Sequence, residues 1–158
     1  MEDILRNAFY EEAEELFQEI EYCILEMDRI GTTKENIDSL FRYMHTLKGS
    51  SAAMQMNDMA TLTHHLEDIL GMVRDQKLGI SREMIDVMLQ SLDEIKMYVA
   101  AHKHDEFYEI NVKKYANMLE LLKAKKFTDN ISKTKEKSKG YEGENINYVN
   151  ALGLDERA

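Results

Sequence analysis

Residues 9–30 read FYEEAEELFQEIEYCILEMDRI, and this segment establishes the helical character of the chain. Its apolar side chains recur at alternating steps of four and three residues: Phe9, Ala13, Leu16, Ile20, Cys23, Met27 and Ile30. Because three to four residues make one helical turn, these side chains form a single stripe. The spacing predicts a bundle helix over about residues 3–29, with Cys23 buried in the stripe as a small hydrophobic residue.

Three further segments repeat this stripe, each after a helix-start signal. The start signals are Thr32 with Glu35 as a capping box, then Asn57 with Asp58, then Ser81. The stripes are Ile37, Leu40, Met44, Leu47, Ser51 and Met54; Met59, Leu62, Leu66, Ile69 and Val73; Ile85, Met88, Leu92, Ile95 and Val99. The third helix is expected over about 59–76 and the fourth over about 82–103. Four matched stripes with short connections predict an all-α fold, an up-and-down antiparallel four-helix bundle.

The C-terminal third has a different character. A fifth helix on the outside of the bundle is expected over about 106–126, with the looser stripe Phe107, Ile110, Tyr115, Met118, Leu121 and Leu122. After Phe127 the composition turns to Ser, Lys, Glu, Asn and Gly, which is typical of a flexible linker. We therefore expect a helical domain over 1–127, followed by a flexible charged linker or the start of a following region over 128–158.

Composition and charge narrow the function classes. The 158 residues are 44% hydrophobic and contain no proline, which suits one globular domain of long helices. The net charge is -10, and residues 1–29 carry ten acidic side chains against two arginines. Such a surface repels nucleic acid and anionic lipid, so neither is an expected partner. The single cysteine cannot form an internal disulfide, and we expect a cytoplasmic protein without membrane insertion, since no apolar run resembles a signal peptide or membrane span.

Two polar pairs stand beside the apolar stripes of the second and third helices. His45 and Lys48 are three residues apart, and so are His64 and Glu67 on the next helix. Residues three apart share a helix face. At about 100° per residue, both pairs flank the core on the same angular side, so we expect them to meet in one groove at the bundle surface. Small residues border this groove at Ala52, Ala60 and Gly71.

This arrangement suggests phosphate chemistry at His45. Glu67 is placed to accept a hydrogen bond from one ring nitrogen of His45, which would leave the lone pair of the other nitrogen facing outward. Lys48 is placed to neutralise phosphoryl oxygens as a point charge. The hypothesis is that His45 is a nucleophile for phosphate. The plain alternative is that these are solvated surface charges of a helical protein.

At these residues the sequence resembles histidine phosphotransfer (HPt) domains, and more narrowly the N-terminal phosphoacceptor domain of CheA-type chemotaxis histidine kinases. The resemblance covers about residues 3–126 and rests on His45-x-x-Lys48-Gly49, the small residues after it, and His64-x-x-Glu67. It implies that His45 takes the γ-phosphoryl of ATP from a separate histidine kinase ATP-binding domain and passes it to an aspartate of response regulator receiver domains.

The resemblance also implies a role for each neighbour of His45. Glu67 orients the imidazole, Lys48 and His64 complete the hydrogen-bonded network, and Gly49 keeps space beside the ring. The stretch Ser50 to Ala53 departs from a more glycine-rich run of the family, which narrows the expected groove slightly.

No glycine-rich phosphate loop or other nucleotide-binding motif is present in the sequence. We therefore expect a phosphorylated substrate and carrier that is not an enzyme on its own and holds no cofactor or metal. Two alternatives remain: a free-standing phosphorelay carrier and a non-catalytic helical interaction module. A metal centre on His45, His64, His65 and Glu67 is disfavoured, because the inward stripes lack the carboxylates of metal-binding bundles.

Overall fold

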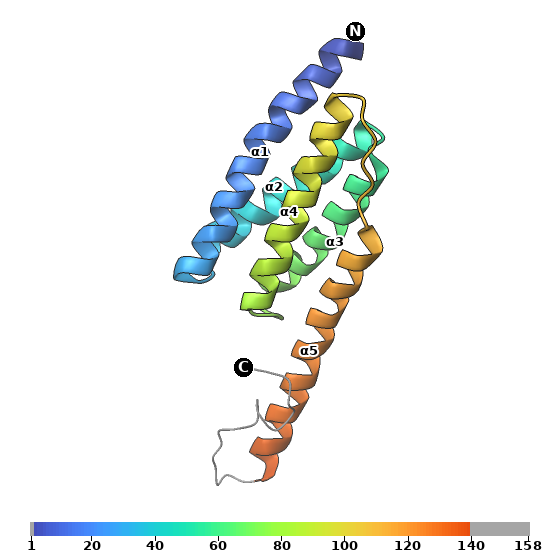
Figure 1. Ribbon diagram of the computed structural model, residues 1–158. Coiled ribbons are helices and arrows are strands. Elements are labelled where there is room, and N and C mark those ends of the chain that lie inside the picture. The colour runs from blue at the N-terminus through green and yellow to red at the C-terminus, as the bar shows by residue number, and fades with distance from the viewer. Residues whose placement is uncertain (1, 140–158) are drawn as a thin grey trace. The chain divides into compact units, whose positions relative to one another are not determined.

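The computed structural model describes the backbone of residues 2–139 and the side chains of residues 2–125. Within this range the chain forms helices and connections without a strand (Figure 1). The helices are α1 (Glu2–Ile30), α2 (Lys34–Ala53), α3 (Asn57–Arg74), α4 (Arg82–Lys103) and α5 (Val112–Lys139). None of the described helices combines the length and apolarity needed to cross a membrane. The all-α prediction is confirmed.

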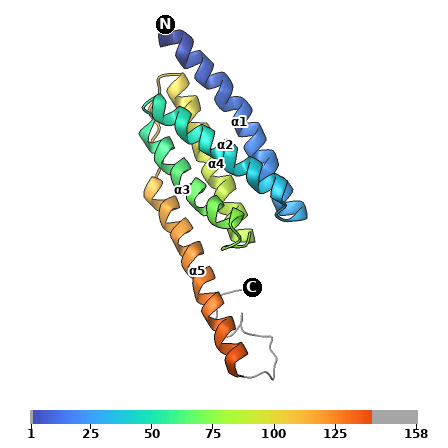
Figure 2. The same ribbon diagram turned by 180° about the vertical axis from the view of Figure 1, so that it is seen from behind.

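The first four helices form an up-and-down bundle. α2 packs against α1 and α3, and α4 packs against the same two helices from the other side. Figure 2 shows α2 lying between α1 and α3. Short connections reverse the chain direction from each helix to the next, so neighbours are antiparallel, as predicted.

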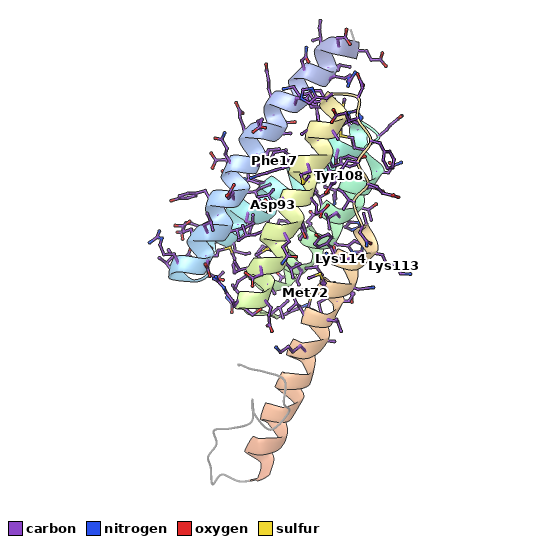
Figure 3. All side chains as sticks on the ribbon, in the orientation of Figure 1. Phe17, Met72, Asp93, Tyr108, Lys113 and Lys114 are labelled. Atoms are coloured by element: carbon purple, nitrogen blue, oxygen red, sulfur yellow. The ribbon has the colours of Figure 1, made fainter. Side chains whose placement is uncertain are left out.

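The apolar stripes read from the sequence form the core of the bundle. Every predicted stripe residue of α3 and α4 is buried, and in α1 the stripe is buried from Phe9 through Cys23 to Met27. Phe17, which lies beside the α1 stripe, is only 2% exposed and adds to the same core (Figure 3). Ile30 is the exception, because it lies at the end of α1 and is 51% exposed.

The start of α2 differs from the prediction by one residue. Thr33, not Thr32, is the N-cap: its hydroxyl accepts a hydrogen bond from the Asn36 backbone N–H, and the Asn36 side chain accepts one from the Thr33 N–H. The side chain of Asn36 also donates to the Gly31 carbonyl and is buried, so this residue fixes the start of the helix.

The predicted start of α4 is confirmed, and the predicted bounds of α3 are corrected. The Ser81 cap is confirmed, since its hydroxyl accepts a hydrogen bond from the Met84 N–H at 3.1 Å. α3 begins and ends two residues before the predicted bounds, and its N-cap is Met56, which has no side-chain cap bond.

The predicted bounds of the fifth helix are wrong at both ends. The chain is not helical from 106 to 111. Within this segment Phe107 is 89% exposed. Tyr108, which is labelled in Figure 3, donates a hydrogen bond to Glu94 of α4. Tyr115 also donates to Glu94, and its burial together with this carboxylate raises its pKa to about 12. α5 continues to Lys139, so the linker predicted from 128 is helical over 128–139.

The predicted linker beyond Lys139 lies outside the described residues. The chain divides into two compact units after Leu119. The first unit contains the bundle and the first turns of α5, and the described part of the second is the rest of that helix. The domain boundary after residue 127 stays a prediction.

Three helices end in the same tight turn. After α3 the Lys77 N–H donates to the Met72 carbonyl at 2.8 Å and the Gln76 N–H to the Val73 carbonyl at 3.0 Å, which is the Schellman pattern. The ends of α2 and α4 repeat it. The position that usually holds glycine in this motif has a positive φ, and here it is Gln55, Gln76 or Asp105. Each of these residues therefore carries the steric cost of a Cβ in the left-handed region.

We expect Gln76→Gly to stabilise the bundle, because glycine removes that cost at a φ of 63°. The gain should be about 0.5–1 kcal/mol in the free energy of unfolding, measured by denaturant titration. The matched control is Gln90→Gly, in the exposed interior of α4, which should lose about 1 kcal/mol. A loss of stability in Gln76→Gly would contradict this interpretation of the turn.

Candidate functional site

The candidate site lies where α2 and α3 run antiparallel beside each other. His45 follows the buried core residue Met44, and Glu67 follows the buried core residue Leu66. Each polar side chain is therefore held at the edge of the core by its buried neighbour. The two edges face each other, so the predicted meeting of the two helix faces is confirmed for His45 and Glu67.

One hydrogen bond fixes the imidazole. His45 Nδ1 lies 2.5 Å from Glu67 Oε2, and because an ionised carboxylate only accepts, Nδ1 must carry the proton. This tautomer leaves the lone pair on Nε2, to which no described residue donates a hydrogen bond. The His45 side chain is 63% exposed, so the arrangement presents an oriented nucleophilic nitrogen at the surface.

Lys48 occupies the second oxygen of the same carboxylate. Its Nζ lies 2.6 Å from Glu67 Oε1, one helical turn along α2 from His45. The contact is an ion pair between the ammonium group and the carboxylate. One buried carboxylate thus joins the two polar side chains of α2 to α3.

Burial of Glu67 and its two partners shift the pKa of its carboxyl group in opposite directions. The residue is 7% exposed, so it is not the surface group that the sequence predicted. Burial alone would raise the pKa of the carboxyl group, but Lys48 and His45 outweigh this effect and lower the pKa. Glu67 is therefore the ionised acceptor that the His45 tautomer requires.

His64 stands apart from this trio. Its Nε2 lies 3.6 Å from Asp68 Oδ1, and its ring stacks with that of His65. Within residues 2–125, no hydrogen bond or ion pair joins His64 to His45, Lys48 or Glu67. The structure thus brings together three of the four predicted network members, and the role of His64 stays a prediction.

The small residues leave space beside His45. Gly49 lies one turn after His45, and a Cβ added there would meet no atom within 4 Å. The face beyond the imidazole is therefore open at this position. Across the described residues, no three His, Cys, Asp or Glu side chains gather as metal ligands would.

Sequence analysis did not identify Arg74, which lies on the same face of α3 as Glu67. Its guanidinium carbon lies 4.1 Å from the centre of the Phe41 ring. The only sequence signal is spacing, since Glu67, Gly71 and Arg74 follow one another at steps of four and three residues.

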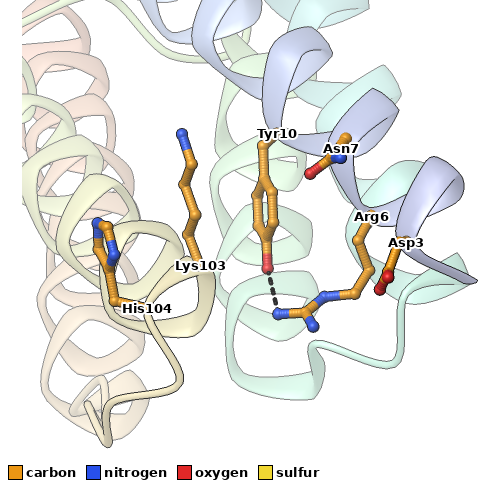
Figure 4. Close-up of a pocket in the computed structure, with 6 residues that line it drawn as sticks. All are labelled: Asp3, Arg6, Asn7, Tyr10, Lys103 and His104. Atoms are coloured by element: carbon orange, nitrogen blue, oxygen red, sulfur yellow. Dashed lines mark hydrogen bonds between the residues drawn. The ribbon is translucent and has the colours of Figure 1, made fainter.

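A second polar cluster lies between α1 and α4 (Figure 4). Arg6 donates to the Tyr10 hydroxyl at 3.0 Å, so the Tyr10 hydroxyl is free to donate to His102 Nδ1 at 2.8 Å. The adjoining pocket has a volume of about 370 Å³ and is lined by Asp3, Arg6, Asn7, Tyr10, Lys103 and His104. None of these residues comes from α2 or α3, so the pocket is separate from the His45 site.

Comparison with known families and proteins gives consistent matches. The family model described as Hpt domain matches residues 4–98. The chemotaxis protein CheA of Borreliella burgdorferi is 36% identical over 121 residues, which is 77% of this chain and 13% of that protein. CheA of Treponema pallidum is 36% identical over 95 residues, or 60% of this chain and 12% of that protein. The chain thus spans about an eighth of the length of these curated relatives.

One solved structure has a similar fold. It is the crystal structure of the phosphorylated P1 domain of CheA3 in complex with CheY6 from R. sphaeroides. The match has a TM-score of 0.69 at 19% sequence identity and covers 77% of this chain and 97% of that chain. At this identity the likeness supports the helical fold alone.

The lowered pKa of Glu67 predicts a specific pH dependence of stability. Its contribution is present above the unfolded pKa of about 4.5 and is lost as the pH falls through the lower folded pKa. We expect the free energy of unfolding of the wild type to fall more steeply below pH 4.5 than that of Glu67→Gln. Denaturant titrations from pH 7 to pH 3 measure this, with Glu11→Gln, an exposed carboxylate of α1, as matched control. Parallel curves for the wild type and Glu67→Gln would contradict the account.

Proposed function

The chain belongs to the Hpt domain family, and we propose that it is the phosphoacceptor domain of a CheA-like chemotaxis histidine kinase. In this proposal His45 takes the γ-phosphoryl group of ATP and passes it to an aspartate of a response regulator receiver domain. The observation that carries the proposal is the hydrogen bond from His45 Nδ1 to Glu67, because it directs the Nε2 lone pair of an exposed imidazole toward solvent.

The chemistry depends on this tautomer. The Nε2 lone pair attacks the γ-phosphorus of ATP, a N–P bond forms, and the bond from phosphorus to the bridging oxygen breaks as ADP leaves. The proton on Nδ1 stays in place, and the positive charge that develops on the imidazole is stabilised by the Glu67 carboxylate. In the second step a carboxylate oxygen of the receiver attacks phosphorus, the N–P bond breaks, and Nε2 regains its lone pair.

Lys48, Gly49 and His64 have supporting roles in the proposal. Lys48 holds the far oxygen of Glu67 and, with its side chain 28% exposed, has ammonium protons left for the phosphoryl oxygens. Gly49 leaves the approach to His45 open. His64, whose ring is 61% exposed, would join the network only when the phosphoryl group or a partner is bound.

The partners and the location are also part of the proposal. ATP would be held by the kinase ATP-binding domain of a longer protein, which agrees with the small share of the CheA relatives that this chain spans. A receiver domain as partner is supported by the similar P1 domain, which was solved in complex with CheY6. Residues 1–127 would form the phosphoacceptor domain, and residues 128–158 would connect it to the next domain. ATP as the donor favours the cytoplasm.

We expect His45→Gln to abolish phosphorylation, because glutamine has no nucleophilic ring nitrogen. The wild type, incubated with ATP and the kinase core of the matching protein, should acquire a phosphate that is labile in acid and stable in base, as a phosphoramidate is. The matched control is His104→Gln, at the exposed end of α4, which should be labelled like the wild type. Label that persists in a folded His45→Gln variant would rule out the proposal.

A further inference from the structure

The packing of α2 against α3 continues one helical turn beyond His45 and Glu67. Phe41 lies four residues before His45, and Gly71 lies four residues after Glu67. On antiparallel helices these offsets carry both residues along the helix pair in the same direction. A Cβ at Gly71 would lie 3.5 Å from Phe41 Cε1, so the two residues face each other as His45 and Glu67 do.

Arg74 is held over the ring of Phe41. Its guanidinium carbon lies 4.1 Å from the ring centre, which is close contact for a cation–π interaction. Arg74 Nε also donates to Asp75 Oδ1 at 3.3 Å. No described residue accepts a hydrogen bond from its two terminal NH₂ groups, and the side chain is 39% exposed. The guanidinium is therefore oriented by its own chain while its planar fork remains available.

The charge on either side of His45 differs from that of the chain as a whole. The protein has a net charge of -10, yet Lys48 lies one turn to one side of His45 and Arg74 lies over Phe41, one turn to the other side. Cations thus lie on both sides of His45 along the helix pair.

We infer that Arg74, oriented by Phe41, is a specificity contact for an acidic side chain on the surface of the receiver domain that accepts phosphate from His45. This inference rests on the proposed function. Transfer requires a carboxylate of the receiver to approach a protein that is itself strongly acidic, so long-range repulsion must be offset locally. The Arg74 guanidinium lies over Phe41, which is one turn from His45, and its fork matches a carboxylate.

Arg74 is a docking residue in this account and takes no part in the transfer step. Of the two proposed partners, the receiver is the one with which the similar P1 domain was solved in complex, so we assign the contact to the receiver and test the kinase domain as the alternative. Removing the cation should then weaken the encounter with the receiver and leave both chemical steps unchanged.

The experiment measures transfer from purified phosphorylated protein to a CheY-type receiver domain of the same organism at increasing receiver concentration. We expect Arg74→Gln to raise KM for the receiver about fivefold at low salt, the size of one surface ion pair, with kcat unchanged. The increase should shrink at high ionic strength. Arg74→Lys should raise KM less than Arg74→Gln does, because lysine keeps the positive charge. Phe41→Leu should also raise KM by a smaller factor, because the guanidinium loses the ring that orients it.

Arg82→Gln is the matched control, since Arg82 also ion-pairs with an aspartate but lies on α4, and its KM should equal that of the wild type. The rate at which the kinase core phosphorylates His45 should be the same in all variants. A wild-type KM in Arg74→Gln would overturn this inference alone, and slower phosphorylation by the kinase would assign Arg74 to the other partner. A wild type that donates to no receiver would overturn the inference together with the proposed function.

Discussion

The buried carboxylate of Glu67 is the constraint on which the site depends. A carboxylate that is 7% exposed must be paired, and both partners, His45 and Lys48, come from one face of α2. The same pairing ties the register of α2 against α3 to the orientation of the imidazole. Glu67 sets both the helix register and the orientation of the imidazole. A shift of α2 or α3 by one turn would therefore leave its carboxylate unpaired at the edge of the core, and His45 would lose the hydrogen bond that orients its ring.

The bundle holds the His45 imidazole at its rim. His45 follows the core residue Met44 in sequence, so its position at the rim is set by the apolar stripe. The open space at Gly49 and the cation stacked on Phe41 extend the site along the helices. A site exposed in this way suits the proposed carrier function, because neither of the two proposed partners would need to open the fold to reach the same nitrogen.

Much of the fold and the site can be predicted from the sequence, and the failures have a common physical cause. Residue spacing along the chain is a local property. It predicts the helices, the core stripes and the trio of His45, Lys48 and Glu67. The start of α2 could not be read from the two adjacent threonines, because it depends on the buried Asn36 side chain. The start of α5 depends on Glu94 of α4, which binds Tyr108 and Tyr115 across the fold. Spacing also groups His64 with Glu67; the structure places Asp68 beside His64, and the role of His64 in the network stays a prediction.

The central claim is that Glu67 holds the proton on Nδ1 of His45, so that Nε2 is the nitrogen that accepts phosphate. The most direct test is ¹⁵N and ³¹P NMR spectroscopy of the phosphorylated protein with ¹⁵N-labelled histidine, which identifies the ring nitrogen bonded to phosphorus. The account predicts a N–P bond at Nε2 and a retained proton on Nδ1. Phosphate found on Nδ1 of His45, or on any other histidine, would contradict it.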